Sequence, residues 1–220
     1  MESKEINLNT AKPKAALRNP SMDILRILAF SLVVSVHFFL QSKFYTLELV
    51  GPRLFIMTVV RSFSLICVPL FMILSGFLMK NKTVSGGYYK GINKTLVTYF
   101  LASIVCYLFW NIYFNEPYGL TDFIGELLSF RAAKYSWYIE MYIGLFLLIP
   151  FINLIYNNLA SKKHKQILIL TLFILTSLSS LNIKLTIIPT WWNDIYPLTY
   201  YFIGAYIREY SFNVKKIYIL

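Results

Sequence analysis

Six apolar stretches, each close to the length of a membrane-crossing helix, constrain this chain more than any other feature. A helix needs about 20 mostly apolar residues to cross the hydrocarbon core of a bilayer, which is about 30 Å thick. Arg61 and Pro69 interrupt the second stretch, and the last two are shorter than the others. We therefore predict an all-α fold, a polytopic transmembrane helix bundle of about six spans. The stretches cover residues 22–42, 56–79, 93–114, 136–156, 166–182 and 196–208.

The composition agrees with a membrane protein. Hydrophobic residues make up 57% of the chain and charged residues 14%, whereas a soluble domain carries about 25% charged residues. We expect residues 1–20 to form a flexible cytoplasmic tail and residues 21–220 to form a single transmembrane domain. The chain closes on a basic pair followed by apolar residues, Lys215 to Leu220. This resembles the opening of a seventh span, so we expect the domain to be C-terminally incomplete.

Lysine and arginine alternate between richer and poorer connecting segments. The seven segments outside the apolar stretches hold 4, 2, 4, 2, 3, 1 and 3 of these residues in chain order. Because cytoplasmic segments carry the excess of basic residues, this alternation places the N-terminus in the cytoplasm. The net charge of +11 then reflects orientation and attraction to anionic membrane lipids. It does not indicate a nucleic-acid partner.

Ionisable residues inside a span are costly and are functional candidates by default. The first stretch carries Asp23, Arg26 and His37. Arg26 and His37 are 11 residues apart, which places them within about 20° of each other on a helix and about 16 Å apart along it. A structural interpretation stays open for each of the three. Asp23 suits the start of a helix, Arg26 can reach the headgroups, and a neutral His37 can be a packing residue.

Two levels of charge follow from this topology. His37, Arg61 and Glu140 all lie in the outer half, where Glu140 either fixes the tautomer of His37 or pairs with Arg61. Basic residues gather at the cytoplasmic edge, where they either set the topology or form a cationic mouth for an anionic ligand. These residues are Arg26, Lys80, Lys82, Lys90 and Lys94. An acyl-CoA fits both levels, because its phosphates attract cations and a histidine at the far end can deprotonate an acceptor hydroxyl.

The motifs of the chain resemble those of the membrane acyltransferase 3 family. Asp23-x-x-Arg26, followed by His37, is similar to the opening signature of that family. Four further motifs resemble family segments in the same order, from about residue 20 to residue 210. They are Val68-Pro69-Leu70-Phe71 to Ser75-Gly76-Phe77-Leu78, Tyr89-Lys90-Gly91-Ile92-Asn93-Lys94, Trp137-Tyr138 to Leu148-Ile149-Pro150, and Pro197 to Gly204.

The resemblance implies transfer of an acetyl or other acyl group from cytosolic acetyl-CoA or acyl-CoA to a hydroxyl of an extracytoplasmic envelope glycan or lipid-linked sugar. It also implies a multi-pass protein of the bacterial plasma (inner) membrane, with no metal. His37 would be the catalytic residue, oriented by Glu140, and Arg26, Lys90 and Lys94 would hold the donor. The family motif at Lys90–Lys94 usually carries arginines, whereas this chain has lysines, which bind phosphate as point charges and not as forks.

Other readings stay open beside this one. Ser75 precedes Gly76, a pair that lets helices approach closely, and Trp137 suits the interfacial belt of a membrane protein. The charges could instead line the pathway of a transporter or flippase for a glycan or lipid-linked sugar. The chain could also be an inactive, truncated member of the family. The sequence does not indicate an oligomeric state.

Overall fold

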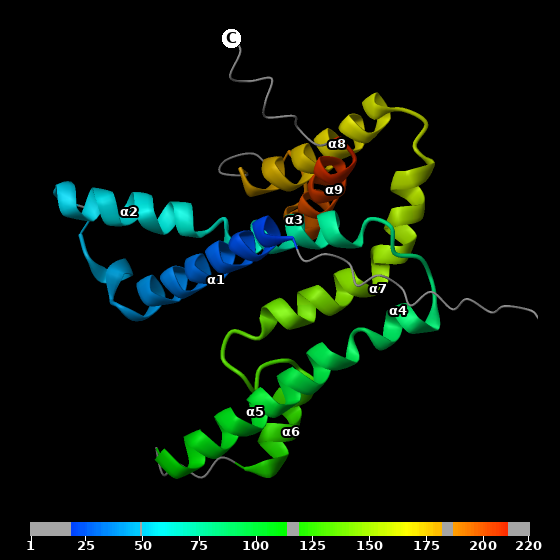
Figure 1. Ribbon diagram of the computed structural model, residues 1–220. Coiled ribbons are helices and arrows are strands. Elements are labelled where there is room, and N and C mark those ends of the chain that lie inside the picture. Colours follow the sequence, from blue (N-terminus) through cyan, green and yellow to red (C-terminus); the bar gives the residue numbers. More distant parts are fainter. Residues whose placement is uncertain (1–18, 49, 114–118, 182–186, 211–220) are drawn as a thin grey trace, which may run out of the picture. The chain divides into compact units, whose positions relative to one another are not determined.

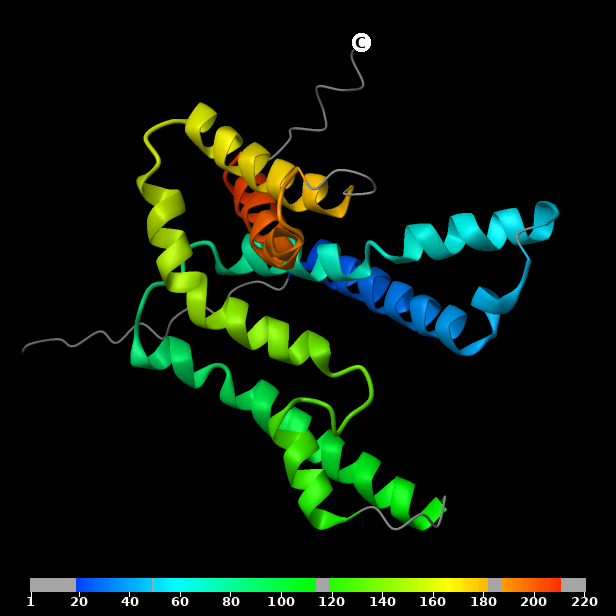
Figure 2. The ribbon, with the colours of Figure 1, turned by 180° about the vertical axis from the view of Figure 1, so that it is seen from behind.

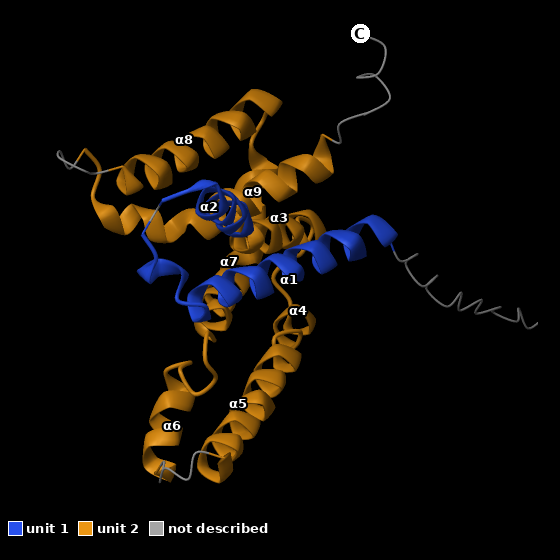
Figure 3. Cartoon of the chain, turned by 90° about the vertical axis from the view of Figure 1, so that its left-hand side faces the viewer, with its two compact units in different colours: residues 1–65 blue, residues 66–220 orange. Residues whose placement is uncertain are grey.

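The computed structural model describes residues 19–48, 50–113, 119–181 and 187–210, and these residues form helices and turns without a strand. The predicted all-α fold is therefore confirmed for the described part of the chain. Most of the predicted tail, residues 1–18, lies outside it. The chain divides into two compact units, residues 1–65 and 66–220 (Figure 3). The sequence analysis predicted one domain, and the boundary between the two units falls inside its second apolar stretch.

Each of the six predicted stretches contains a helix (Figure 1). The helices are α1 (Pro20–Gln41), η1 (Phe44–Thr46), α2 (Pro52–Ser64), α3 (Cys67–Met79), α4 (Gly86–Lys90), α5 (Asn93–Tyr113), α6 (Leu120–Leu128), α7 (Trp137–Asn158), α8 (Lys162–Ser180), η2 (Thr190–Ile195) and α9 (Tyr196–Glu209). The second stretch is split between α2 and α3. Pro69 explains the position of the break, because its ring would clash with the carbonyl of Leu65 in a continuous helix.

Four helical stretches are long and apolar enough to cross a membrane. They are Pro20–Gln41, Pro52–Met79, Gly86–Tyr113 and Trp137–Asn158. The other two predicted spans correspond to α8 and α9, which do not belong to this set. The first turn of α8 holds three lysines, and the 14 residues of α9 rise only about 21 Å. The prediction of about six spans is thus supported for four.

In the first unit, α1 and α2 pack together near the turn that joins them. Phe39, from the end of α1, and Leu54, from the start of α2, are buried with Phe44 of η1. The rings of Phe39 and Phe44 meet edge to face with centroids 5.1 Å apart. This small apolar cluster holds the turn.

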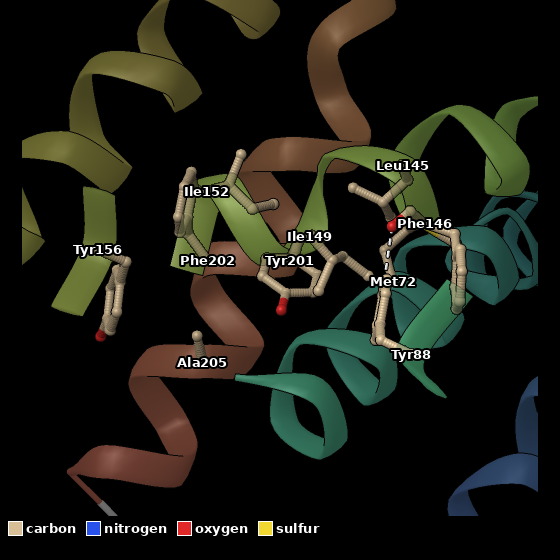
Figure 4. Close-up of a cluster of buried hydrophobic side chains, with 10 residues drawn as sticks. All are labelled: Met72, Tyr88, Leu145, Phe146, Ile149, Ile152, Tyr156, Tyr201, Phe202 and Ala205. Carbon is tan, nitrogen blue, oxygen red and sulfur yellow. Dashed lines mark hydrogen bonds between the residues drawn. The ribbon is translucent and has the colours of Figure 1, made fainter. Parts of the chain in front are cut away.

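In the second unit, a central core consists of α3, α7 and α9. Gly76 of α3 and Gly204 of α9 let these two helices touch through their backbones. A Cβ atom on Gly76 would lie 1.9 Å from the carbonyl oxygen of Tyr201, and one on Gly204 would lie 2.0 Å from that of Ile73. Figure 4 shows the buried cluster around this crossing, which comprises Met72, Tyr88, Leu145, Phe146, Ile149, Ile152, Tyr156, Tyr201, Phe202 and Ala205.

An α5–α6 pair extends the second unit (Figure 2). From the sequence, the segment after α5 is expected to be a connecting loop, and the helix α6 is not predicted. Phe123 of α6 packs on Tyr107 with ring centroids 4.4 Å apart. The hydroxyl of Tyr99 donates a 3.0 Å hydrogen bond to the carbonyl oxygen of Leu127. Because Leu127 follows Phe123 whereas Tyr99 precedes Tyr107, α6 folds back along α5.

Candidate functional site

His37 is held by its own helix. It lies on α1, partly buried, and its Nδ1 is 2.8 Å from the carbonyl oxygen of Val33, one turn earlier. A carbonyl oxygen can only accept a hydrogen bond, so Nδ1 of the neutral imidazole carries the proton. Nε2 then carries the lone pair, which is the arrangement required of a general base. The sequence analysis assigned the control of this tautomer to Glu140, whereas the structure provides a partner within α1.

Asp23 and Arg26 form an ion pair in the first turns of α1. The guanidinium Nη1 of Arg26 lies 2.6 Å from Oδ1 of Asp23. Asn19 caps the helix by accepting a hydrogen bond from the Ser21 amide, and Asp23 lies where a negative charge stabilises the helix dipole. The structural interpretation of Asp23 as part of the helix start is therefore supported. The Arg26 side chain remains 48% exposed, so it can still contact a ligand.

Arg61 contacts an aromatic side chain of its own unit. Its Nε donates a 2.7 Å hydrogen bond to the hydroxyl of Tyr45, and its guanidinium carbon lies 5.1 Å from the centre of the Tyr45 ring. The sequence analysis did not predict this contact, because Tyr45 lies in the turn before α2. The suggested pairing of Arg61 with Glu140 would join the two units and stays a prediction.

Lys94 lines a groove between α5 and α7. The groove has a volume of about 290 Å³ and is formed by Lys94, Thr95, Thr98, Tyr99, Ala102 and Ile139. The first five of these residues lie on one face of α5, because they follow the spacing of a helix. Lys90, at the end of α4, is also exposed. Both lysines that were predicted for the donor site in the second unit are therefore accessible, and Lys94 has threonines beside it in the groove.

Glu140 lies in the first turn of α7 and is exposed, as is Trp137 at the first position of the helix. From the sequence, Glu140 and Lys94 are expected at opposite levels of the bilayer. In the structure, however, Ile139, adjacent to Glu140, lines the same groove as Lys94. The reason is α6, which carries the chain back along α5 before α7 begins. The exposure of Trp137 agrees with an interfacial position.

The Ser75 hydroxyl is bonded to the backbone of its own helix. Its hydroxyl donates a 2.9 Å hydrogen bond to the carbonyl oxygen of Phe71 on the same helix. The neighbouring Gly76 makes the backbone contact with α9 described above. The reading of Ser75-Gly76 as a close helix contact is thus confirmed at Gly76.

An ionic cluster at the ends of α3, α8 and α9 was missed by the sequence analysis. Glu209 accepts from Lys165 at 2.6 Å and pairs with Lys80 at 2.8 Å. Burial raises the pKa of the Glu209 carboxyl, but the hydrogen bonds and positive charges of the two lysines outweigh it and hold the pKa at about 2. A signal was present in the sequence, since Glu209 is the single carboxylate in the predicted cytoplasmic segments that follow α1.

The structure therefore brings some candidates together within each unit. Asp23 pairs with Arg26 in the first unit, and in the second Lys94 shares a groove with the residue next to Glu140. A contact between His37 and Glu140 would join residues of the two units, and it stays a prediction. The same holds for a shared donor site of Arg26 with Lys90 and Lys94. Among the described residues, no group of three or more His, Cys, Asp or Glu side chains could hold a metal ion.

Comparison with known proteins agrees with the motifs. The comparisons with curated proteins and with solved structures gave no match. A family defined by an acyltransferase domain matches residues 19–219, which is nearly the whole chain and includes every candidate residue named above. With its long apolar helices, its Asp23-x-x-Arg26 and His37 motif and this match, the chain belongs to the acyltransferase 3 family of membrane proteins.

Proposed function

We propose that this protein transfers an acetyl group from cytosolic acetyl-CoA to a hydroxyl of an extracytoplasmic glycan or lipid-linked sugar. Membership of the family supports acyl transfer in general. The acetyl group, the glycan acceptor and a bacterial plasma membrane are the proposed refinements. In this proposal α8 and α9 complete a set of about six spans around the site.

The observation that carries the proposal is the hydrogen bond between Nδ1 of His37 and the Val33 carbonyl. It fixes the one tautomer in which Nε2 can accept a proton, and it does so inside an apolar helix. A base held in one orientation loses less freedom during the reaction than a mobile one. The tautomer with its lone pair on Nε2 is the one that proton abstraction from a sugar hydroxyl requires, and this supports His37 as the general base.

The chemistry balances with His37 as the general base. Nε2 takes the proton of the acceptor hydroxyl while the hydroxyl oxygen forms a bond to the thioester carbonyl carbon. The carbon–sulfur bond then breaks, and the CoA thiolate leaves with the proton that the imidazolium returns. The products are the O-acetyl ester and free CoA, and His37 ends as a neutral imidazole.

The donor-site residues act by charge. Lys94 lies at one end of the groove along α5, and the side chains of Thr95 and Thr98 follow it. A phosphate held at Lys94 would allow the narrow pantetheine arm of the donor to extend along these hydroxyls. Arg26 is proposed as the second cation, since its ion pair with Asp23 leaves the guanidinium half exposed.

The first experiment measures O-acetyl content of the surface polysaccharide after deletion of the gene and complementation. His37→Ala should reduce acetylation to the level of the deletion strain while the protein still inserts in the membrane. His164→Ala is the matched control, because the chain has two histidines and His164 is exposed at the start of α8. Full acetylation by the His37→Ala protein would overturn the proposal.

A second variant tests the partner of His37. If the Val33 carbonyl alone sets the tautomer, Glu140→Gln should retain most of the activity. If Glu140 also stabilises the imidazolium, acetylation should fall by roughly tenfold or more with normal expression. Lys94→Gln should raise the KM for acetyl-CoA and leave kcat nearly unchanged, because its charge binds the donor and does not touch the reacting carbonyl.

A further inference from the structure

A proline inside α7 leaves one backbone carbonyl without its usual partner. In an α-helix, the carbonyl oxygen of each residue accepts a hydrogen bond from the amide four residues later. Pro150 lies inside α7 and has no N–H to donate to the carbonyl oxygen of Phe146. Both residues are buried, and an unpaired buried carbonyl is unfavourable. Another part of the chain therefore has to supply the donor.

Tyr88 of the short helix α4 supplies this donor. Its hydroxyl donates a 2.6 Å hydrogen bond to the carbonyl oxygen of Phe146, drawn as the dashed line in Figure 4. The Tyr88 ring also stacks on the Phe146 ring, with the centroids 4.4 Å apart and 9° between the ring planes. One side chain thus pairs the carbonyl that Pro150 leaves free and packs on the side chain of the same residue.

The helix α4 is too short and too rich in glycine to be stable by itself. It has five residues and begins with Gly86 and Gly87, and glycine is a poor helix former. A single helical turn also gains too few hydrogen bonds to offset the cost of starting a helix. Tyr88 is the one buried residue of α4. The contacts of Tyr88 with α7 therefore decide where α4 lies.

The two lysines proposed to bind the donor follow directly after Tyr88. Lys90 is the last residue of α4 and Lys94 lies in the first turn of α5. Between them, a Cβ atom on Gly91 would lie 3.7 Å from ring atom Cζ of Phe146. Lys94 shares its groove with Ile139, which precedes Phe146 on α7 by about two turns. The chain from Tyr88 to Lys94 thus runs beside α7, and its contacts with Phe146 set the position of both lysines.

We infer that Tyr88 is a positioning residue for donor binding. By pairing the carbonyl that Pro150 leaves free, it holds Lys90 and Lys94 at a fixed spacing beside α7. Tyr88 is itself buried, so it acts through the two lysines and not by touching the donor. Two cations bind the phosphates of one ligand best when their spacing is fixed in advance. The inference rests on the proposed function, in which these lysines hold acetyl-CoA.

The first test measures the affinity of the full chain for coenzyme A in detergent. The dissociation constant is taken from the rise of the thermal unfolding midpoint with coenzyme A, because a ligand that binds the folded state stabilises it. Tyr88→Phe should raise this constant by roughly fivefold, since the lysines lose their fixed spacing. Tyr201→Phe is the matched control. It removes another buried hydroxyl of the same cluster, one that donates to Asn153 on α7 at 2.8 Å, and should leave the constant unchanged.

The second test concerns the carbonyl of Phe146 and needs no ligand. In the natural protein, Tyr88→Phe should lower the unfolding midpoint by about 3 °C, because it leaves this buried oxygen unpaired. Pro150→Ala restores an amide N–H that can donate to the same oxygen within α7. In the Pro150→Ala background, Tyr88→Phe should therefore lower the midpoint by less than half as much. Equal losses in both backgrounds would overturn the pairing of Tyr88 with the carbonyl that Pro150 leaves free.

Failure of this inference and failure of the proposed function give different results. If the natural protein binds coenzyme A and Tyr88→Phe binds it as tightly, the positioning role alone is overturned. The same follows if Tyr201→Phe weakens binding as much as Tyr88→Phe, since the effect would then be a general loss of stability. If the natural protein does not bind coenzyme A, the proposed function and the positioning role both fail. A protein that binds it through Tyr88 and does not acetylate a glycan would overturn the proposed function only.

Discussion

The central core and the α5–α6 pair each contain a long apolar helix, α7 and α5, yet they are packed in different ways. In α7, 33% of an apolar 18-residue segment is buried inside the protein. In the helical stretch Gly86–Tyr113, which includes α5, only 11% of the corresponding segment is buried. The core is joined by glycine contacts, stacked rings and a buried asparagine. The pair is joined by the ring contact of Phe123 with Tyr107 and by the hydrogen bond of the Tyr99 hydroxyl.

This difference shows that hydropathy selects the environment of a helix and not its neighbours. Lipid tails are as apolar as leucine, so helices in a membrane associate through close packing and hydrogen bonds. The core has such features on α3, α7 and α9, whereas α5 leaves large apolar side chains exposed, such as Val97, Leu101 and Val105. Substitutions in the core should therefore cost far more than those in the pair.

The largest expected effect is at the glycine crossing. Gly76→Ala places a methyl group 1.9 Å from a backbone oxygen of α9, and a backbone cannot move aside as a side chain can. We expect a loss of about 3 kcal/mol or more in the free energy of unfolding. The measurement is thermal unfolding of the purified protein in detergent. Gly144→Ala is the matched control, because nothing lies within 4 Å of its Cβ position on α7, and a normal midpoint for Gly76→Ala would refute the contact.

The next effect is at the ionic cluster. Glu209→Gln removes the carboxylate that Lys80 and Lys165 share and leaves one buried and one largely buried ammonium group without it. We expect a loss of about 2–3 kcal/mol in the free energy of unfolding. Removing one partner leaves the other charges uncompensated, which destabilises the fold more than the intact pair stabilises it. Glu126→Gln, at a half-buried carboxylate of α6, serves as the control in the same unfolding measurement. Equal midpoints for the two variants would show that the cluster contributes nothing to stability.

The same carboxylate predicts a pH dependence. The pKa of Glu209 is about 2 in the folded protein, below the ordinary value of 4.5 for a glutamate. Because the folded pKa is the lower one, the stabilisation is fully present above about pH 4.5 and is lost as the pH falls towards 2. The difference in unfolding midpoint between the natural protein and Glu209→Gln should therefore shrink between pH 5 and about pH 3. A difference that stays constant over this range would contradict the ion pair.

Asn153 tests the hydrogen bonds of the core. Its side-chain amide donates to the carbonyl oxygens of Met79 and Lys82, each at 2.8 Å, and its oxygen accepts from the Tyr201 hydroxyl at 2.8 Å. Asn153→Leu leaves these groups unpaired in the interior, so we expect a loss of about 2 kcal/mol. Asn158→Leu is the control, because Asn158 is exposed and its amide donates to the Leu154 carbonyl of its own helix. An effect of the same size at both positions would show that the three hydrogen bonds of Asn153 make no specific contribution to the free energy of unfolding.

The sequence predicts those features of the fold and of the candidate site that depend on a local pattern of residues. The helical class and the apolar stretches follow from hydropathy, and the break near Pro69 follows from proline geometry. The family motif identified His37 and Arg26. The partner of His37 could not be predicted in this way, because whether its ring turns to the Val33 carbonyl or to another helix depends on the side-chain conformation.

Contacts between residues that are far apart in the chain could not be predicted from the sequence, because they depend on how the helices cross. Glu209 and Lys80 are far apart in the chain, and only the crossing of α3 and α9 brings them together. Likewise α6 was treated as a loop, because its Asp122 and Glu126 read as polar connecting residues. Its fold-back along α5 rests on Phe123, one apolar side chain whose partner lies on another helix.

The smallest effect is expected in the α5–α6 pair. Tyr99→Phe removes the hydroxyl that donates to the Leu127 carbonyl and leaves the ring in place beside Phe130, at 5.1 Å. A hydrogen bond of this kind contributes about 1 kcal/mol, and the pair contacts the core over little surface. The overall unfolding midpoint should therefore stay unchanged while amide hydrogen exchange in α6 becomes about fivefold faster, with the amides of α9 as the internal control. If exchange accelerated in α9 as well, the pair and the core would open as one unit, and the contrast between them would be wrong.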